Sequence, residues 1–349
     1  MLFAAGVTPA ACANADAFSR CAKSYADNDA KRLKCFDRAL APVEPVQEKP
    51  EASLPALSEQ ISPPIEQAQQ KEGRSYMTRA WNLDNRPSLD SSSLDRLQPY
   101  QQNYLIVNNT SNVNTQPSSP VIGHTVLTPY DWDTIEAKFQ LSFKADMVTQ
   151  ENLDIWGLKT LRIWGAYTQQ SYWQAFNTRN SSPFRETDYQ PELIASLATG
   201  NEIGWKLLNL GFLHQSNGQA DPQSRSWNRL YAQGGWEWGG FSLMGRGWWR
   251  IPENSLKDDN PDILHYMGHG DLVLRWEPAD KSQAVSLLLR NNLSMSQNLG
   301  YMQLDWSMPV PLGHAARLHT QISSGYGESL IDYNYRQTTV GMGISFREW

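Results

Sequence analysis

A polar stretch near the middle of the chain carries residue types that could hydrolyse an ester. His214, Ser216 and Asn228 lie within HQSNGQADPQSRSWNRLY. A serine hydroxyl becomes a useful nucleophile when a neighbouring imidazole accepts its proton, and a third side chain must hold that imidazole in one tautomer. Asn228 could do so as a neutral substitute for the more common aspartate. A histidine two residues before a serine is usually incidental, however, so the position of the three side chains in the fold decides between the two interpretations.

The chain from residue 103 to residue 349 is predicted to be an all-β, transmembrane antiparallel barrel. Its short segments of alternating polarity are separated by turn residues, which is the pattern of an outer-membrane barrel. The mean hydropathy of −0.54 agrees with this fold, because alternate residues of each strand face a polar lumen. The 14 Trp and 14 Tyr also favour it, since amphipathic rings gather at the membrane interface. A spanning helix is excluded, because no stretch approaches roughly 18 consecutive apolar residues.

About twelve strands are expected, an even number that returns the chain to its starting side. The segments share alternation and bounding turns: 104–108, 137–147, 161–170, 192–199, 203–214, 225–236, 241–250, 265–276, 284–292, 300–308, 316–324 and 335–346. Short turns such as 199–202 and 238–240 alternate with longer connections at 171–188, 215–224 and 251–264. We expect the longer connections to face outward and the short ones to face the periplasm.

The direction of the strands places the three polar residues at the outer rim, and the alternation along each strand places them on the lipid side of the wall. Side chains two residues apart share a face of a strand, so His214 and Ser216 align with the apolar Phe212. In the returning strand, Asn228 aligns with Leu230. A polar group at the membrane interface costs little and can meet a phospholipid ester. The shared face and the rim position therefore favour catalysis on membrane lipids.

The residues before the barrel are expected to serve export and tethering. We expect four parts. Residues 1–13 are a signal peptide, either complete or truncated at its start, and residues 14–40 are a small helical segment with a cysteine pair. Residues 41–102 are a Pro/Gln-rich linker and lead-in, and residues 103–349 are the barrel. The first part has the apolar run and small residues of an export signal but lacks a basic start. If Cys12 leaves with the signal, Cys21 and Cys35 remain as a pair that can form a disulfide in the periplasm. A lipoprotein anchor at Cys12 is the alternative.

The composition and the expected lumen bear on two other classes of function. The net charge is −6, and no basic stripe of the kind that captures phosphate backbones is present, so nucleic acid is not an expected partner. A non-catalytic porin-like or structural barrel is the main alternative to an enzyme. It would need a wide lumen, whereas Arg225, Trp227, Arg229 and Tyr231 are expected to point inward and fill the interior.

Four separated motifs, in order, carry a resemblance to a known family. They are NSSPFRETDYQPEL, HQSNGQADPQSRSWNRLY, DDNPDILHYMG and SGYGESLIDYNYRQT, which begin at residues 180, 214, 258 and 324. Together they resemble the bacterial outer-membrane phospholipase A family, the phospholipase A1 family, over roughly residues 104 to 349. Motifs of this length are hard to match by accident.

The resemblance implies a twelve-stranded barrel of the outer membrane that is active as a homodimer and requires calcium. It implies hydrolysis of acyl ester bonds in phospholipids and lysophospholipids at the outer leaflet, as phospholipase A1, phospholipase A2 and lysophospholipase. Matched residue by residue, His214 would be the general base, Ser216 the nucleophile and Asn228 the residue that orients the imidazole.

The resemblance also implies the residues that would bind calcium. Ser181 of one subunit would act with Gln219 and Ser224 of the other. The family commonly has arginine at the position of Gln219, and the exchange is harmless if the ligand there is the backbone carbonyl. A second calcium position would match Asp221 and Asp259, although an aspartate before a proline, as at Asp221, is also an ordinary turn residue.

Two further positions match the family. Gln169 would lie at the subunit contact, where its amide, otherwise unsatisfied among aromatics and lipid, would pair with its copy across a two-fold axis. The alternative is that Gln169 faces the lumen, although the alternation of its strand, which gives Leu161 and Ile163 the same parity, favours the outer face. Trp349 ends the chain with an aromatic residue, as barrel-insertion signals do, although Arg347 departs from the apolar residue usual two places before it.

Overall fold

The computed structural model falls into two compact units, Met1–Ser62 and Pro63–Trp349. The residues that it describes are 22–24, 31, 33–35, 74–84, 97–153, 155–255, 257–311 and 316–346. In the first unit the described residues are helical, and Cys35 is disulfide-bonded. The expected signal at 1–13, Cys12, Cys21 and Trp349 lie outside the described residues, so the expected division of the N-terminal part stays a prediction.

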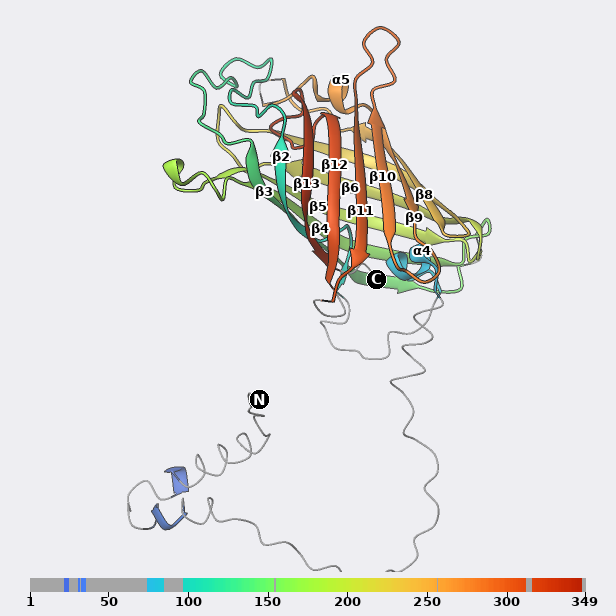
Figure 1. The fold of residues 1–349 in the computed structure, drawn as a ribbon. Helices are drawn as coiled ribbons and strands as arrows, with labels where there is room; N and C mark the ends of the chain where they lie inside the picture. The colour runs from blue at the N-terminus through green and yellow to red at the C-terminus, as the bar shows by residue number, and fades with distance from the viewer. Residues whose placement is uncertain are drawn as a thin grey trace, which may run out of the picture. The chain divides into compact units, whose positions relative to one another are not determined.

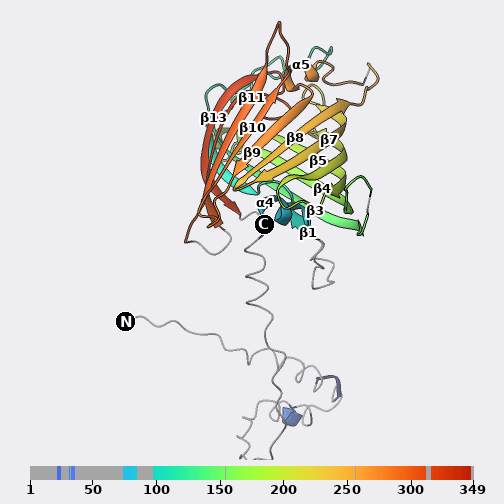
Figure 2. The same cartoon turned by 90° about the vertical axis from the view of Figure 1, so that its right-hand side faces the viewer.

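The second unit is a closed antiparallel barrel of twelve strands (Figures 1 and 2). Neighbours in sequence pair with one another from β3 to β13, and β2 closes the ring between β13 and β3. The strands are β2 (Tyr104–Thr110), β3 (Ile135–Gln150), β4 (Thr160–Trp173), β5 (Phe184–Ala198), β6 (Gly204–Ser216), β7 (Ser226–Trp238), β8 (Phe241–Arg250), β9 (Gly270–Trp276), β10 (Ala284–Asn291), β11 (Gly300–Pro309), β12 (Ala316–Tyr326) and β13 (Arg336–Phe346). A short strand, β1 (Leu97–Pro99), adds to β3 beside β2. The predicted architecture is confirmed.

Two of the predicted strand starts are wrong. β9 begins at Gly270 rather than residue 265, because Ile263–Met267 form a short helix, α5, which ends at Gly268 in a positive-φ conformation. β5 begins at Phe184 rather than residue 192. Most residues in its first half are polar, so the apolar alternation typical of a barrel strand is missing there. The acidic Glu186 and Asp188 of this half are nevertheless buried and face the barrel interior. The loop that carries Ser181 is therefore shorter than predicted.

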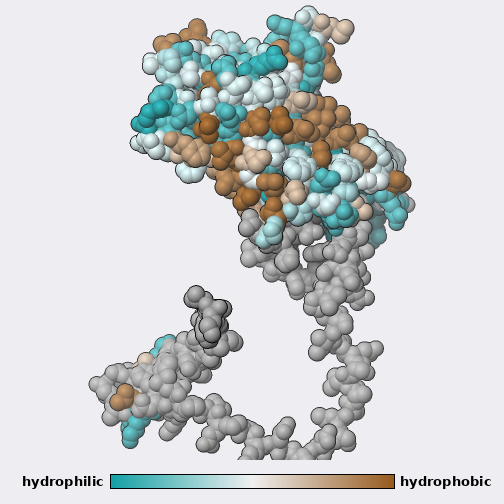
Figure 3. Space-filling model, viewed as in Figure 1, coloured by the Kyte–Doolittle hydropathy of each residue, from teal (hydrophilic) through white to brown (hydrophobic). Residues whose placement is uncertain are grey.

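Exposure alternates along the strands as the polarity pattern predicts. On β6, Leu210 is 48% exposed and Phe212 is 40% exposed, while Leu213 between His214 and Phe212 is 1% exposed. Apolar side chains gather over the middle of the wall, between more hydrophilic ends (Figure 3). This is the outer surface expected of a barrel in hydrocarbon.

None of the helices in the described part of the chain has the length and apolar composition of a membrane-spanning helix.

The interior of the barrel is packed with side chains. Near the outer end, a cluster of buried apolar residues joins the wall to α5 and to the β12–β13 loop: Leu213, Trp227, Tyr231, Trp248, Ile263, Met267, Leu330 and Tyr333. Arg225 and Arg229 are buried as well, which confirms their inward orientation. A buried charge near the same end is paired, because Arg185 contacts Glu136 and Asp332 at 2.8 Å each. A filled interior of this kind differs from the wide lumen that a porin needs.

A second helix, α4 (Tyr76–Trp81), packs into the barrel from the side of the short turns (Figure 2). Its Met77 and Trp81 are buried against the wall, in a cluster with Trp164. The helix has no side-chain cap of its own. Instead, Glu237 of the wall accepts a hydrogen bond from the backbone N–H of Met77 at 2.9 Å, which satisfies a free donor of the first turn. Part of the predicted lead-in is therefore an element of the barrel core.

Candidate active site

His214 and Asn228 lie opposite each other on neighbouring strands. In the register of β6 with β7, their Cα atoms are direct partners. Nδ1 of His214 lies 2.9 Å from Oδ1 of Asn228. Because an amide oxygen can only accept, this contact places the proton of the neutral ring on Nδ1 and leaves Nε2 as an acceptor. That is the tautomer required of a general base acting through Nε2.

Ser216 is the last residue of β6 and shares the outward face with His214. Positions two apart on a strand are separated by about 6.6 Å of rise, a span that an imidazole directed along the strand can reach. Both side chains are partly exposed, in contrast to the buried Gln215 between them. The structure thus joins His214 to Asn228 and places Ser216 on the same outer face, at the rim that carries the long loops.

The loop from Asn217 to Arg225, directly after the serine, is held by two buried side chains. The Asn217 carboxamide accepts from the backbone N–H of Arg225 at 3.0 Å and donates to the carbonyl of Gln223 at 2.8 Å. The Arg225 guanidinium donates to the carbonyl of Ser224 at 2.7 Å. Gly218 has φ +64, in the left-handed region that favours glycine. The backbone that follows Ser216 is therefore rigidly shaped.

The residues matched to calcium sites lie on three loops of this rim. Ser224 donates from Oγ to Oδ2 of Asp259 at 2.7 Å, which joins the β6–β7 loop to the β8–β9 loop. Ser181 is exposed on the β4–β5 loop, and Gln219 is half-buried. All five candidates can offer oxygen donors, which is the donor set that calcium prefers. Among them the structure brings Ser224, Asp221 and Asp259 into one neighbourhood.

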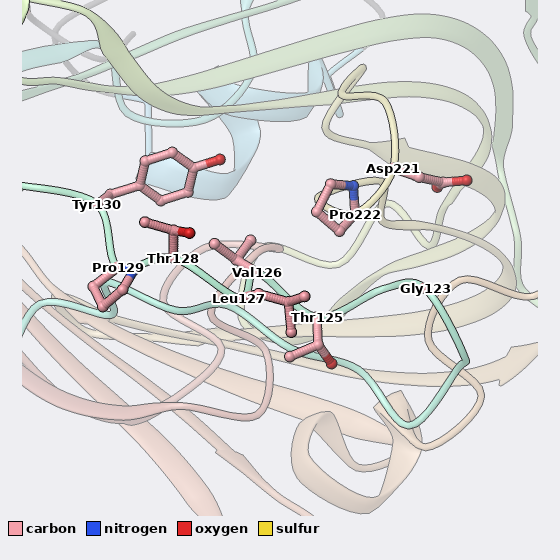
Figure 4. A pocket seen from close by; sticks show the side chains of 9 residues that line it. All are labelled: Gly123, Thr125, Val126, Leu127, Thr128, Pro129, Tyr130, Asp221 and Pro222. Carbon is pink, nitrogen blue, oxygen red and sulfur yellow. The ribbon is translucent and has the colours of Figure 1, made fainter.

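His124 joins this group, and the sequence did not single it out. Its Nε2 lies 3.4 Å from Oδ1 of Asp221, and the ligand atoms of His124, Asp221 and Asp259 all lie within 4.8 Å of one another. The β2–β3 loop that carries His124 packs against the β6–β7 loop around an open hollow of about 590 Å³ (Figure 4). Asp221 lies at the edge of this hollow. No local signal in the sequence links these two loops.

Gln169 faces outward on β4, beside Tyr167, as the strand alternation predicted. The expectation that its amide would lack partners within one subunit is wrong. Oε1 accepts a hydrogen bond from Tyr167 and Nε2 donates one to Ser171, both at 3.2 Å. Since neighbours two residues away on the same strand satisfy both ends of the amide, pairing across a two-fold axis would have to replace or add to these bonds.

Glu253, at the start of the β8–β9 loop, is a second residue that the sequence did not indicate. Its Oε1 lies 3.4 Å from Nδ2 of Asn228. The amide of Asn228 therefore contacts an imidazole on one side and a carboxylate on the other.

A family model described as phospholipase A1 matches residues 77–346 of this chain. The chain belongs to the phospholipase A1 family. A Neisseria meningitidis relative is 39% identical over 67% of this chain, which corresponds to 61% of that protein, so the match spans less than two thirds of its length. The Salmonella typhimurium phospholipase A1 is 36% identical over 72% of this chain and 82% of its own.

Two solved structures of outer membrane phospholipases also match. The Salmonella typhi enzyme, crystallised as a dimer with bound calcium, is 34% identical, with a TM-score of 0.62 over 78% of this chain and 98% of that chain. An Escherichia coli outer membrane phospholipase A with an active-site asparagine replaced by alanine matches with the same identity, TM-score and coverage. Family membership makes this chain a phospholipase A1 of the outer membrane.

Proposed function

We propose that this enzyme hydrolyses acyl ester bonds of membrane phospholipids and lysophospholipids, at the sn-1 or sn-2 position, with Ser216 as nucleophile. The 2.9 Å contact between His214 and Asn228, two residues from a serine on the same outward face, is the observation that supports this proposal most directly. The Escherichia coli enzyme has an active-site asparagine, and Asn228 is the asparagine that contacts the imidazole here.

Ser216 and His214 would carry the proton through both halves of acyl transfer. As Oγ of Ser216 attacks the acyl carbonyl carbon, its proton passes to Nε2 of His214, and the imidazolium keeps its Nδ1 hydrogen bond to Asn228. His214 then returns that proton to the departing alcohol oxygen, which leaves an acyl ester on Ser216. Water repeats the sequence and releases the fatty acid. Backbone N–H groups of the rigid turn after Ser216 are suited to stabilise the oxyanion.

Calcium binding is proposed for the rim loops. Ser181 of one subunit, with Gln219 and Ser224 of the other, would hold an ion beside the nucleophile, where a divalent cation stabilises developing negative charge on oxygen. Asp221 and Asp259 would form a second, separate cation position. The close approach of His124 adds a nitrogen donor to that second position, which calcium does not favour.

Activity gated by homodimerisation follows from the same assignment, since the first calcium position takes residues from both subunits. The related Salmonella typhi structure is a dimer with bound calcium. The outward apolar wall offers the surface for such a contact, and Gln169 is the polar group proposed to lie within it. Substrate would reach the site from the outer leaflet.

The test is fatty-acid release from phosphatidylethanolamine in mixed micelles by purified Ser216→Ala, with and without calcium. We expect loss of activity to the background rate with normal folding, judged by the heat-dependent gel mobility of the barrel. Ser196→Ala, a serine buried inside the barrel on β5, is the matched control and should keep its activity. Calcium-dependent release by Ser216→Ala at the wild-type rate would exclude this residue as nucleophile.

A further inference from the structure

Asn228 has a second partner, which the proposed catalytic roles leave unexplained. The carboxylate of Glu253 accepts a hydrogen bond from Nδ2 of Asn228, with 3.4 Å between the two atoms. The loop that carries Glu253 is anchored at the same residue, because the backbone N–H of Ile251 donates to the carbonyl oxygen of Asn228 at 2.8 Å. Asn228 therefore positions both the carboxylate and the backbone that supports it.

A carboxylate behind the amide decides which way the amide faces. An ionised carboxylate can only accept hydrogen bonds, so Asn228 must turn its NH₂ group toward Glu253 and its oxygen toward His214. If the amide were reversed, NH₂ would face Nδ1 and favour the tautomer with its proton on Nε2. A ring in that form could not accept a proton from Ser216. The carboxylate thus excludes the unproductive tautomer.

We propose that Glu253 is a positioning residue of this phospholipase, which fixes the orientation of Asn228 and supplies the negative charge that the neutral asparagine lacks. When Ser216 loses its proton, the imidazolium has only an amide as its direct partner. A carboxylate beyond that amide polarises its oxygen and stabilises the positive ring. Catalytic hydrogen bonds are often long in the resting protein and shorten as charge develops, in keeping with the 3.4 Å separation.

The surroundings of Glu253 make its charge sensitive to pH. Partial burial raises the pKa of this carboxyl group, Arg250 of β8 lowers it, Asp258 raises it, the hydrogen bond from Asn228 lowers it, and Asp259 raises it. The guanidinium of Arg250 is already engaged by Asp258 at 2.5 Å. Glu253 should therefore take up a proton at a higher pH than an ordinary glutamate, and its positioning effect should be lost below that pH.

The first test compares Glu253→Gln with wild type and with Glu202→Gln, which removes the same charge from an exposed turn at the opposite rim. We expect Glu253→Gln to lower kcat about tenfold with little change in KM, as for the loss of one charge-assisted hydrogen bond. The wild-type to Glu253→Gln ratio should shrink toward one as pH falls, because a protonated carboxyl has lost the same charge. Unchanged kinetics, or a ratio independent of pH, would overturn the inference.

The second test exchanges the two groups. Asn228→Asp alone sets two carboxylates against each other and should be poorly active. Adding Glu253→Gln restores a donor facing an acceptor, so the double variant should exceed Asn228→Asp at least tenfold. A double variant no better than the product of the two single effects would show that the contact does not act in catalysis.

The inference rests on the proposed Ser216, His214 and Asn228 triad, and the two can fail separately. If Ser216→Ala kept its activity, the proposed function itself would fail, whatever the outcome at Glu253. If Ser216→Ala were inactive while Glu253→Gln matched Glu202→Gln at every pH, the triad would stand and only the role of Glu253 would be wrong.

Discussion

Replacing Asn228 with alanine tests the orienting hydrogen bond directly. The change removes the oxygen that lies 2.9 Å from Nδ1 of His214 and leaves the imidazolium without its acceptor in the transition state. A hydrogen bond to a charged group contributes about 1.5 to 3 kcal/mol, and each 1.4 kcal/mol is a factor of ten. We therefore expect kcat to fall between about tenfold and one hundredfold, while KM changes little because the amide does not hold the substrate.

The assay is the initial rate of fatty-acid release from phosphatidylethanolamine micelles at saturating calcium, with kcat and KM determined separately. Asn209→Ala is the matched control. Nδ2 of Asn209 donates to Gln233 at 2.9 Å across the same two strands, but this pair faces the barrel interior. It should lower stability and leave kcat near wild type.

Either of two results would refute the reasoning. If Asn228→Ala kept kcat within twofold of wild type, the hydrogen bond would not contribute to the transition state. If Asn209→Ala lowered kcat as much as Asn228→Ala, the loss would come from weaker pairing of β6 with β7 rather than from an unsupported imidazole.

Three further predictions concern calcium, the barrel interior and helix α4. Chelation should abolish fatty-acid release and added calcium should restore it, with Ser224→Ala needing more calcium for half-maximal activity; activity that survives chelation would contradict the proposed ion. Arg185→Ala leaves Glu136 and Asp332 buried without their cation and should lower the free energy of unfolding in urea by about 3 to 5 kcal/mol; a loss under 1 kcal/mol would show that water enters the site. Trp81→Ala removes the buried anchor of α4 and should expose the bond after Arg79 to trypsin while the barrel keeps its folded gel mobility; unchanged protection would mean that other contacts hold the helix.

The strands and their faces could be predicted because both follow from local geometry. Side chains alternate across a strand, and one face of this barrel meets lipid, so the pattern of each segment reports its own orientation. His214 and Phe212 were assigned to the same outer face for that reason. Alternation does not mark a strand whose polar residues have another cause. Glu186 and Asp188 are acidic because they accept backbone hydrogen bonds from Ile331 and Leu330, and the strand that carries them was predicted to start too late.

The sequence by itself determined the barrel, the parity of its strands and the outward placement of His214, Ser216 and Asn228, since each depends on neighbours a few residues apart or on the pairing of consecutive strands. Only the tertiary structure decided that His124 approaches Asp221, that Glu253 lies behind Asn228 and that Met77 is held by Glu237. These contacts join a loop or a helix to residues that lie from 25 to 160 positions away in the sequence. Their geometry depends on how the closed wall and its filled interior direct each connection, and no local periodicity encodes that packing.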